Sequence, residues 1–239
     1  AVDKGFTALK LDPFSAFLEN RRRGYVGSIS LKGEQMGLES TSAVRSAVGS
    51  EIEILIDAHG HYDVPTAKRL ANGLSKSNIT WFEEPLPPEN FSALKQLRES
   101  TTIPICVGER LYTRWDFVQI FENRLADYIM PDVTCTGGIS ELRKIAAMAE
   151  IYYIPISPHN AAGPIQIFAG AHTMMNVPNF YRLEFNISAI EGYNQIITPN
   201  IDVRNGNLHL SDKPGLGIDL DEEYLQSTQV NEWSGGWDH

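Results

Sequence analysis

The stretch TWFEEPLPPENFSALKQLRESTTIPICVGE, residues 80–109, decides the fold. It opens on a short apolar run (80–83), continues with a helical pattern from Pro88, and closes on a second apolar run (103–109). The runs are continuous rather than alternating, which is typical of strands buried on both faces of a parallel sheet. We therefore interpret the stretch as one strand–helix–strand unit with parallel strands.

The same unit recurs along the chain. Further apolar or β-branched runs occur at residues 7–12, 53–57, 128–132, 153–159 and 180–184. From Asp57 to Glu184, the polar residues that end successive runs are 26, 26, 23, 27 and 25 residues apart. Repeated units of this length predict a (β/α) barrel. A doubly wound open sheet would also alternate, but the Gly137-Gly138 pair lacks the spacing of a G-x-G-x-x-G phosphate loop.

The polar strand ends predict the site, because the C-terminal ends of barrel strands meet in one mouth. These ends are Asp57, Glu83, Glu109, Asp132, His159 and Glu184. A single acidic strand end is usually a helix cap or turn residue, but six polar strand ends at matched spacing are hard to explain by capping. Carboxylates that share a mouth repel one another unless a cation lies between them. Asp57, Glu83 and Glu109 form an oxygen-only set that suits Mg²⁺ better than zinc.

Two histidines accompany this set. His159 ends its own run, and Asp132 ends the preceding one, where it could orient the imidazole and raise its basicity. His59 lies two residues beyond Asp57 and would face the same side in an extended chain. We expect both imidazoles to serve in proton transfer, although a lone histidine is more often structural.

The composition excludes several classes of protein. With 20 Lys+Arg against 30 Asp+Glu the formal net charge is −10, and no basic stripe is present, so nucleic acid is not expected as a partner. No stretch approaches the roughly 18 apolar residues of a membrane span. Two cysteines cannot form a disulfide scaffold, and they favour a reducing compartment, the cytoplasm.

With these residues in hand, the chain resembles the barrel domain of the enolase superfamily, in the mandelate racemase subgroup. The resemblance runs from about residue 5 to residue 220 and rests on IDAHGHYD (56–63), WFEEP (81–85), GERLYTRWDF (108–117), MPDVTCTGGISELRKIAAMAE (130–150) and SPHNAAGPI (157–165). It is nearest to sugar-acid dehydratases of the galactonate and gluconate type. It implies a (β/α)7β barrel. The chain would then contain strands two to eight of that barrel in residues 1–220, without the first strand and the N-terminal α+β capping domain.

The resemblance also implies roles for the residues at the mouth. Asp57, Glu83 and Glu109 would be Mg²⁺ ligands, with Glu84 behind them. His159 with Asp132 would be the base, and Glu184 would donate a hydrogen bond at the substrate carboxylate. His59 would be the acid.

One tripeptide departs from the racemase pattern. Racemases of this subgroup carry Lys-x-Lys at the end of the second strand, where this chain has Lys10-Leu11-Asp12. A racemase needs a proton donor or acceptor on each face of the carbanion, so Asp12 favours elimination and leaves Lys10 as a helper. Asp12, Arg110 and Asn160 are candidates for contact with substrate. The stretch from Phe14 to Gly37, which includes Arg21-Arg22-Arg23, is expected to be a long loop near the substrate, or else to carry a solvated basic patch.

The expected function is therefore a Mg²⁺-dependent dehydratase of an aldonate, such as galactonate or gluconate, that yields a 2-keto-3-deoxy acid. An epimerase or cycloisomerase on the same platform is the alternative, and a catalytically silent binding relative is the third. The expected partner is a small acid sugar, within a homo-oligomer. Residues 221–239 are expected to be a tail that docks on the cap or on a neighbouring subunit.

Overall fold

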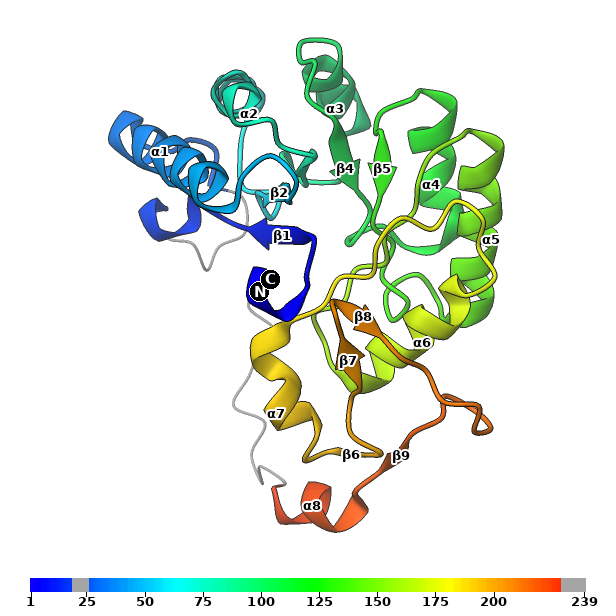
Figure 1. Ribbon diagram of the computed structural model, residues 1–239. Helices are drawn as coiled ribbons and strands as arrows, with labels where there is room; N and C mark the ends of the chain where they lie inside the picture. Colours follow the sequence, from blue (N-terminus) through cyan, green and yellow to red (C-terminus); the bar gives the residue numbers. More distant parts are fainter. Residues whose placement is uncertain (19–25, 229–239) are drawn as a thin grey trace.

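The centre of the molecule is a ring of parallel strands. The computed structural model describes residues 1–18 and 26–228. Five strands lie in chain order, namely β1 (Ala8–Leu11), β2 (Glu53–Asp57), β3 (Trp81–Glu83), β4 (Ile105–Val107) and β5 (Tyr128–Ile129). Isolated parallel bridges from Ile129 to Ile156 and from Ile156 to Phe180 extend this order. In the described part of the chain, seven strand segments thus follow one another around the centre (Figure 1).

Helices cover the outside of this ring (Figure 1). They are α1 (Leu31–Val48), α2 (Val64–Leu74), α3 (Phe91–Arg98), α4 (Thr113–Glu122), α5 (Ile139–Ile151) and α6 (Pro164–Met174). Short 3-10 turns form η1 (Val2–Lys4), η2 (Ser15–Phe17) and η4 (Ser75–Ser77). Local sequence starts the helices: the Asp63 side chain caps α2 by accepting from Thr66 N, and Pro65 occupies its first turn. The predicted barrel of alternating strands and helices is confirmed.

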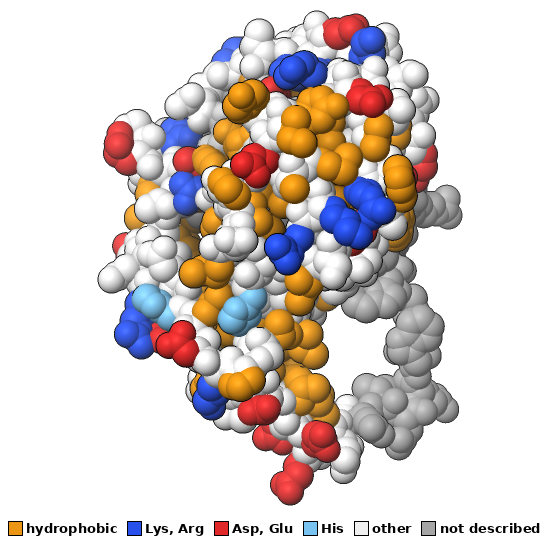
Figure 2. Space-filling view, turned by 90° about the vertical axis from the view of Figure 1, so that its right-hand side faces the viewer, with side chains coloured by type: hydrophobic (Ala, Val, Ile, Leu, Met, Phe, Trp, Pro, Cys, Tyr) orange, Lys and Arg blue, Asp and Glu red, His pale blue; other side chains and the backbone are white. Residues whose placement is uncertain are grey.

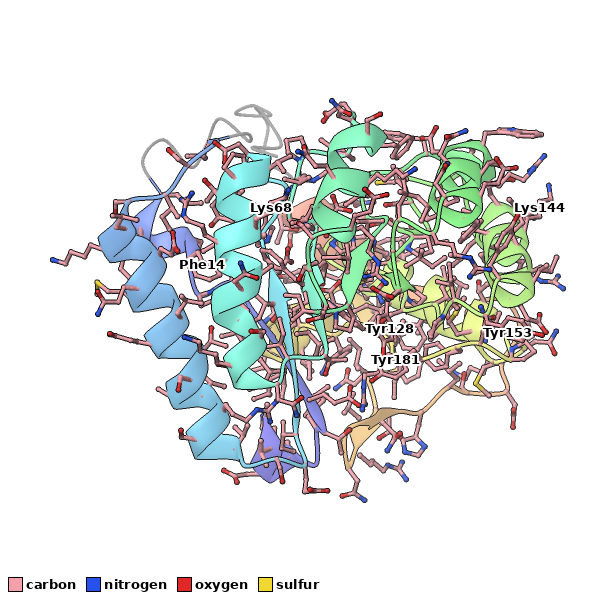
Figure 3. The ribbon with its side chains drawn as sticks, turned by 90° about the horizontal axis from the view of Figure 1, so that it is seen from above. Phe14, Lys68, Tyr128, Lys144, Tyr153 and Tyr181 are labelled. Carbon is pink, nitrogen blue, oxygen red and sulfur yellow. The ribbon has the colours of Figure 1, made fainter. Side chains whose placement is uncertain are left out.

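The side chains of each strand alternate between two hydrophobic clusters. Ile54 and Ile56 belong to the main core beneath the helices, whereas Leu55 belongs to a smaller cluster that includes Trp81. Tyr128 and Tyr181 border this smaller cluster with ring centroids 5.1 Å apart, and they lie side by side in Figure 3. The strands are therefore buried on both faces, as their continuous apolar runs require.

Two expectations from the sequence need correction. The runs at 153–159 and 180–184 do not form full strands; they pair through single bridges that include Asp132 to His159. The expected loop from Phe14 to Gly37 is wrong over its last part, because α1 begins at Leu31. The arginines at 21–23 lie outside the described residues.

Buried glycines explain why the sequence pattern did not predict α1. Gly33, Gly37 and Thr41 are the buried residues of this helix, and a methyl group on Gly37 would meet the ring of Phe14. The helix therefore comes close to its neighbours at small residues, and its large apolar side chains that contact the core are only partly buried.

A satellite unit follows the last barrel segment. It comprises η5 (Ile187–Ala189), α7 (Ile190–Tyr193), the pair β6 (Ile197–Thr198) and β9 (Asp219–Leu220), the hairpin β7 (Val203–Arg204) and β8 (Asn207–Leu208), and α8 (Glu222–Ser227). Phe168 of α6 joins Ile197 and Ile201 in its small core. It thus lies within the range that the sequence assigned to the barrel and its tail; residues 229–239 are outside the described part.

The surface carries exposed apolar side chains along α5 and α6. Ile151, Tyr153 and Met175 are each at least three-quarters exposed, and Figure 2 looks onto this side of the molecule. Within residues 1–18 and 26–228, none of the helices combines the length and apolarity that crossing a bilayer requires.

Candidate active site

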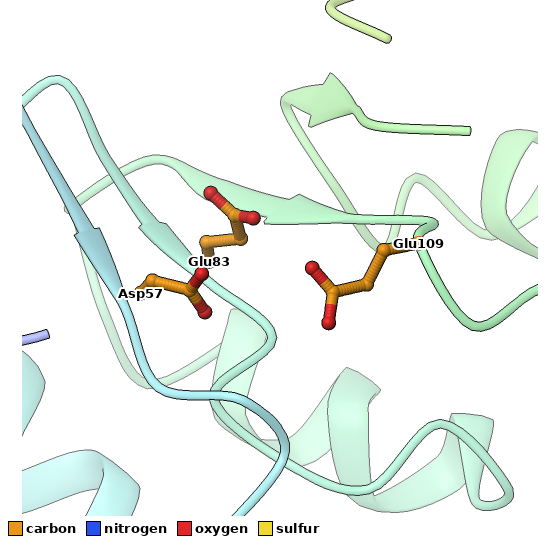
Figure 4. A group of neighbouring side chains, drawn as sticks. All are labelled: Asp57, Glu83 and Glu109. Atoms are coloured by element: carbon orange, nitrogen blue, oxygen red, sulfur yellow. The ribbon is translucent and has the colours of Figure 1, made fainter. Parts of the chain in front are cut away.

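Three carboxylates converge at the C-terminal ends of neighbouring strands (Figure 4). Asp57 ends β2, Glu83 ends β3 directly beside it in register, and Glu109 follows β4 by two residues. One oxygen from each of the three lies within 4.8 Å of the others. Parallel register is what brings residues 26 positions apart to one point.

The three carboxylates carry like charges that a bound cation would offset. Glu83 is fully buried, and burial together with repulsion from Asp57 raises its pKa well above the usual range. Glu109 Oε2 is buried and makes no hydrogen bond within the described structure. An all-oxygen donor set with an unsatisfied buried oxygen fits a hard divalent cation.

Lys10 supplies a positive charge at the edge of the trio. From β1, its Nζ lies 2.5 Å from Glu83 Oε1 and 3.0 Å from Asp57 Oδ2. It also lies 2.7 Å from Glu184 Oε1. Burial alone would lower the pKa of Lys10, but attraction from these carboxylates raises it well above its ordinary value. Lys10 therefore remains an ammonium group and links the trio to Glu184.

His159 forms a dyad with Asp132. Its Nδ1 lies 2.7 Å from Asp132 Oδ2, and its Nε2 lies 3.5 Å from Glu109 Oε2. Burial would lower the pKa of His159, but the Asp132 hydrogen bond and the charges of Glu184 and Glu109 raise it. Burial likewise would raise the pKa of Asp132, and the hydrogen bonds from His159 and Thr134 lower it. The pair is thus built to keep the carboxylate ionised and the imidazole basic.

His59 forms a second dyad, with Asp12. Its Nδ1 lies 2.9 Å from Asp12 Oδ2, and its Nε2 lies 3.5 Å from Asp57 Oδ2. Burial would lower the pKa of His59, but Asp12 and Asp57 raise it. The two imidazoles therefore lie beside different members of the trio: His59 beside Asp57, and His159 beside Glu109.

The residues expected to contact substrate have protein partners. The Arg110 guanidinium donates to the His59 carbonyl oxygen, with its Nε 3.5 Å from Glu109 Oε1. Asn160 N donates to Glu184 Oε2 at 2.9 Å, and its side-chain Nδ2 donates to the Glu184 carbonyl at 3.1 Å. Asp12 faces His59. All three thus hold other site residues in place.

Glu84 lies behind the trio, in the left-handed backbone region with φ 39°. Its Oε1 accepts from Gly108 N at 2.8 Å. Burial and repulsion from Glu109 raise the pKa of Glu84 to about 8. The pKa of this carboxyl therefore depends on the same acidic cluster.

Sequence reasoning missed two supporting residues. Trp81 Nε1 donates to Glu83 Oε2 at 2.9 Å, a contact that the two-residue spacing along a strand could have indicated. Gln166 of α6 donates to Asp132 Oδ2 at 2.5 Å and accepts from Ala162 N at 2.6 Å. No sequence signal marks Gln166, because it reaches Asp132 only through the packing of α6.

Comparison with known proteins agrees with the fold. The family model described as enolase C-terminal domain-like matches residues 1–224. The D-xylonate dehydratase of Haloferax volcanii is 35% identical over 193 residues, 81% of this chain and 47% of that protein. A D-gluconate/D-galactonate dehydratase from Picrophilus torridus is 31% identical and covers 94% of this chain and 56% of its own length.

A solved structure gives the same picture. The mandelate racemase/muconate lactonizing enzyme-like protein from Rubrobacter xylanophilus superposes with a TM-score of 0.87 at 38% identity. The match covers 97% of this chain and 59% of that one, so the present chain spans about half the length of its relatives. The family assignment made from the sequence is confirmed: this chain belongs to the enolase C-terminal domain-like family, among proteins of the mandelate racemase and muconate lactonizing enzyme type.

Proposed function

We propose that the protein is a Mg²⁺-dependent dehydratase of an aldonate. The observation that carries this proposal is the pair of imidazoles on the carboxylate trio, each with Nε2 at 3.5 Å from a different carboxylate and Nδ1 on an aspartate. Dehydration needs one base and one acid, which two such groups supply. The names of relatives, which include xylonate, gluconate and arabinonate dehydratases, support the substrate class.

Asp57, Glu83 and Glu109 would hold the metal. When bound, Mg²⁺ supplies positive charge that offsets the negative charge developing on the substrate carboxylate. Lys10 and Glu184 are assigned to bind and orient that carboxylate, since they lie 2.7 Å apart beside the trio. This arrangement lowers the cost of removing the neighbouring proton.

His159 is assigned as the base. Its Nε2 takes the proton from the carbon next to the carboxylate, while Asp132 holds Nδ1 and stabilises the imidazolium that forms. His59 is assigned as the acid that protonates the departing hydroxyl. The resulting enol becomes a 2-keto-3-deoxy acid by tautomerisation.

The test uses the full-length protein with Mg²⁺ and a library of aldonates. Formation of a semicarbazide-reactive 2-keto acid supports the proposal, and chelation of the metal should abolish it. Product formation that survives His159→Ala undiminished would refute the base assignment.

An epimerase is the second candidate, because Lys10 places a second proton-carrying group on the trio. Reaction in D₂O separates the two: epimerisation returns the C2 epimer of the substrate with deuterium at C2, and dehydration accumulates keto acid. We further propose that the enzyme acts in the cytoplasm as a homo-oligomer, and light scattering on the full-length protein tests the oligomer.

A further inference from the structure

Asp12 uses its two side-chain oxygens for different purposes. Oδ1 accepts from the backbone N–H groups of Phe14, at 3.0 Å, and Ser15, at 2.9 Å, which fixes the turn after β1. Oδ2 is left for His59 Nδ1, at 2.9 Å. The turn therefore holds the carboxylate still while one oxygen is aimed at the imidazole.

His59 is fixed at every polar point of its backbone and at its ring. Its φ of 51° lies in the left-handed region, which costs free energy in a residue with a side chain. Asp57 Oδ1 accepts from its N–H at 3.0 Å, and the Arg110 guanidinium donates to its carbonyl oxygen. A strained backbone that is held in this way presents the ring in one orientation, with Nε2 toward the trio.

The arrangement repeats that of the other dyad. Asp12 Oδ2 to His59 Nδ1 is 2.9 Å, and Asp132 Oδ2 to His159 Nδ1 is 2.7 Å. In both, the carboxylate oxygen accepts the Nδ1 proton, so that Nε2 is the nitrogen left to exchange protons with a ligand.

We propose that Asp12 is a positioning residue for His59 in the leaving-group half of the reaction. It fixes the Nδ1–H tautomer and aims Nε2 at the departing hydroxyl; it does not read a substrate hydroxyl itself. This inference rests on the proposed dehydratase function.

The step that depends on Asp12 is the loss of the C3 hydroxyl as water. His159 has taken the C2 proton, and the electron pair left on the substrate forms the C2–C3 double bond as the C3–O bond breaks. His59 enters this step as the imidazolium, with a proton on each ring nitrogen. Its Nε2 proton goes to the leaving oxygen, which departs as water, and the Nδ1–H that faces Asp12 remains. The enol that remains takes up a proton at C3 and loses its hydroxyl proton to become the ketone.

The central variant is Asp12→Asn in the full-length protein with Mg²⁺. Asparagine keeps an Oδ1 acceptor for the turn, but its amide N–H would face Nδ1 and favour the wrong tautomer. We expect water elimination to fall about 10²-fold or more, the range of a lost acid. We expect C2 proton exchange in D₂O to change by less than about threefold, since His159 and Asp132 are untouched.

A substrate with a better leaving group isolates the acid step. Elimination of fluoride from a 3-deoxy-3-fluoro aldonate needs little protonation, so Asp12→Asn should retain this activity. His59→Asn should show the same pattern, and the double variant should lose little more than either single one, because the two residues act as a unit. Two-bond ¹⁵N–¹H NMR of the imidazole should show the tautomer change without any turnover. Asp221→Asn, which alters an aspartate whose side chain caps α8, is the matched control.

The outcomes are distinct. Water elimination at the wild-type rate in Asp12→Asn overturns the inference, as does an equal loss of water elimination, fluoride elimination and C2 exchange. If Asp12→Asn does not fold, two other measurements test the inference: the rates of water and fluoride elimination by His59→Asn, and the tautomer of His59 in the wild type. A wild-type His59 that carries its proton on Nε2 alone refutes the inference. A wild-type protein that neither exchanges the C2 proton nor forms keto acid overturns the proposed function itself, and this inference with it.

Discussion

The Asp132→Asn substitution tests the proposal that His159 is the base. Asp132 Oδ2 lies 2.7 Å from His159 Nδ1, and Oδ1 accepts from Thr134 N at 2.7 Å. Asparagine keeps the Oδ1 acceptor and so preserves the turn after β5. It removes the negative charge beside the imidazole and, with it, the oxygen that accepts from Gln166 Nε2.

The size of the effect follows from that contact. A hydrogen bond to a charged group contributes about 1.5 to 3 kcal/mol. At 1.36 kcal/mol for each unit, removing it lowers the pKa of His159 by about 1 to 2 units. A base must be neutral to accept a proton, and the pKa of His159 in the wild type is raised above its ordinary value. The acid limb of kcat/KM should therefore move to lower pH by about 1 to 2 units in the variant.

The rate at the plateau should also fall. The asparagine N–H facing Nδ1 favours the tautomer that carries its proton on Nε2, and that nitrogen can then no longer accept one. We expect a loss of about 10²-fold or more in keto-acid formation and in C2 exchange alike.

The assay is the pH profile of kcat/KM for both readouts in the full-length enzyme. Asp127→Asn is the control, since Asp127 lies at the opposite end of β5 and binds Arg98. It should lower stability without moving the profile. An acid limb in Asp132→Asn that coincides with the wild type would refute the reasoning.

Three further predictions concern the supports of the barrel. Trp81→Phe should weaken Mg²⁺ binding about 10- to 100-fold by calorimetry, because Glu83 Oε2 loses its 2.9 Å donor. Gly37→Ala should lower the free energy of unfolding by about 1 to 3 kcal/mol in a denaturant titration, because its methyl group would overlap the Phe14 ring. Glu53→Gln should lower it by about 1 to 2 kcal/mol at neutral pH. Burial would raise the pKa of Glu53, but the hydrogen bonds that its carboxylate accepts outweigh burial and lower the pKa. The difference in stability between wild type and variant is therefore complete above the unfolded pKa of Glu53, and it disappears as the pH falls through the folded pKa.

Each of these has a control in the chain. Trp115 is 68% exposed, so Trp115→Phe should leave metal binding unchanged. Gly192→Ala meets no atom within 4 Å and should be nearly neutral. Glu99, in an exposed pair with Lys95, should change stability by less than about 0.5 kcal/mol when made Gln. A control that matches its test variant would contradict the corresponding prediction.

The site residues at strand ends could be predicted because their positions depend on local sequence and on one architectural rule. Parallel strands put Asp57 and Glu83 in register, and regular spacing then places Glu109 near them. The pairing of Asp12 with His59 could not be predicted, since it depends on a turn 47 residues away and on a left-handed φ. The sequence suggested only that Asp12 is a candidate for contact with substrate.

The helix α1 and the satellite unit are elements that the sequence pattern could not predict. Sequence periodicity detects helices that bury large apolar side chains, and α1 instead buries Gly33, Gly37 and Thr41. The two-residue strands β6 to β9 are too short to leave a pattern. Their positions come from tertiary contacts with α6, which no local window contains.

The barrel has a seam with consequences for the order of folding. β1 and the Phe180 segment stand at opposite ends of the strand order, and side chains join them: Arg182 Nη1 to Thr7 Oγ1 spans 175 positions of sequence at 3.0 Å. Closing so long a loop is entropically costly, so this seam should form late and open first. It also joins β1, which carries Lys10, to the segment that ends at Glu184. The 2.7 Å ion pair between Lys10 Nζ and Glu184 Oε1 therefore forms only when this last contact of the barrel has closed.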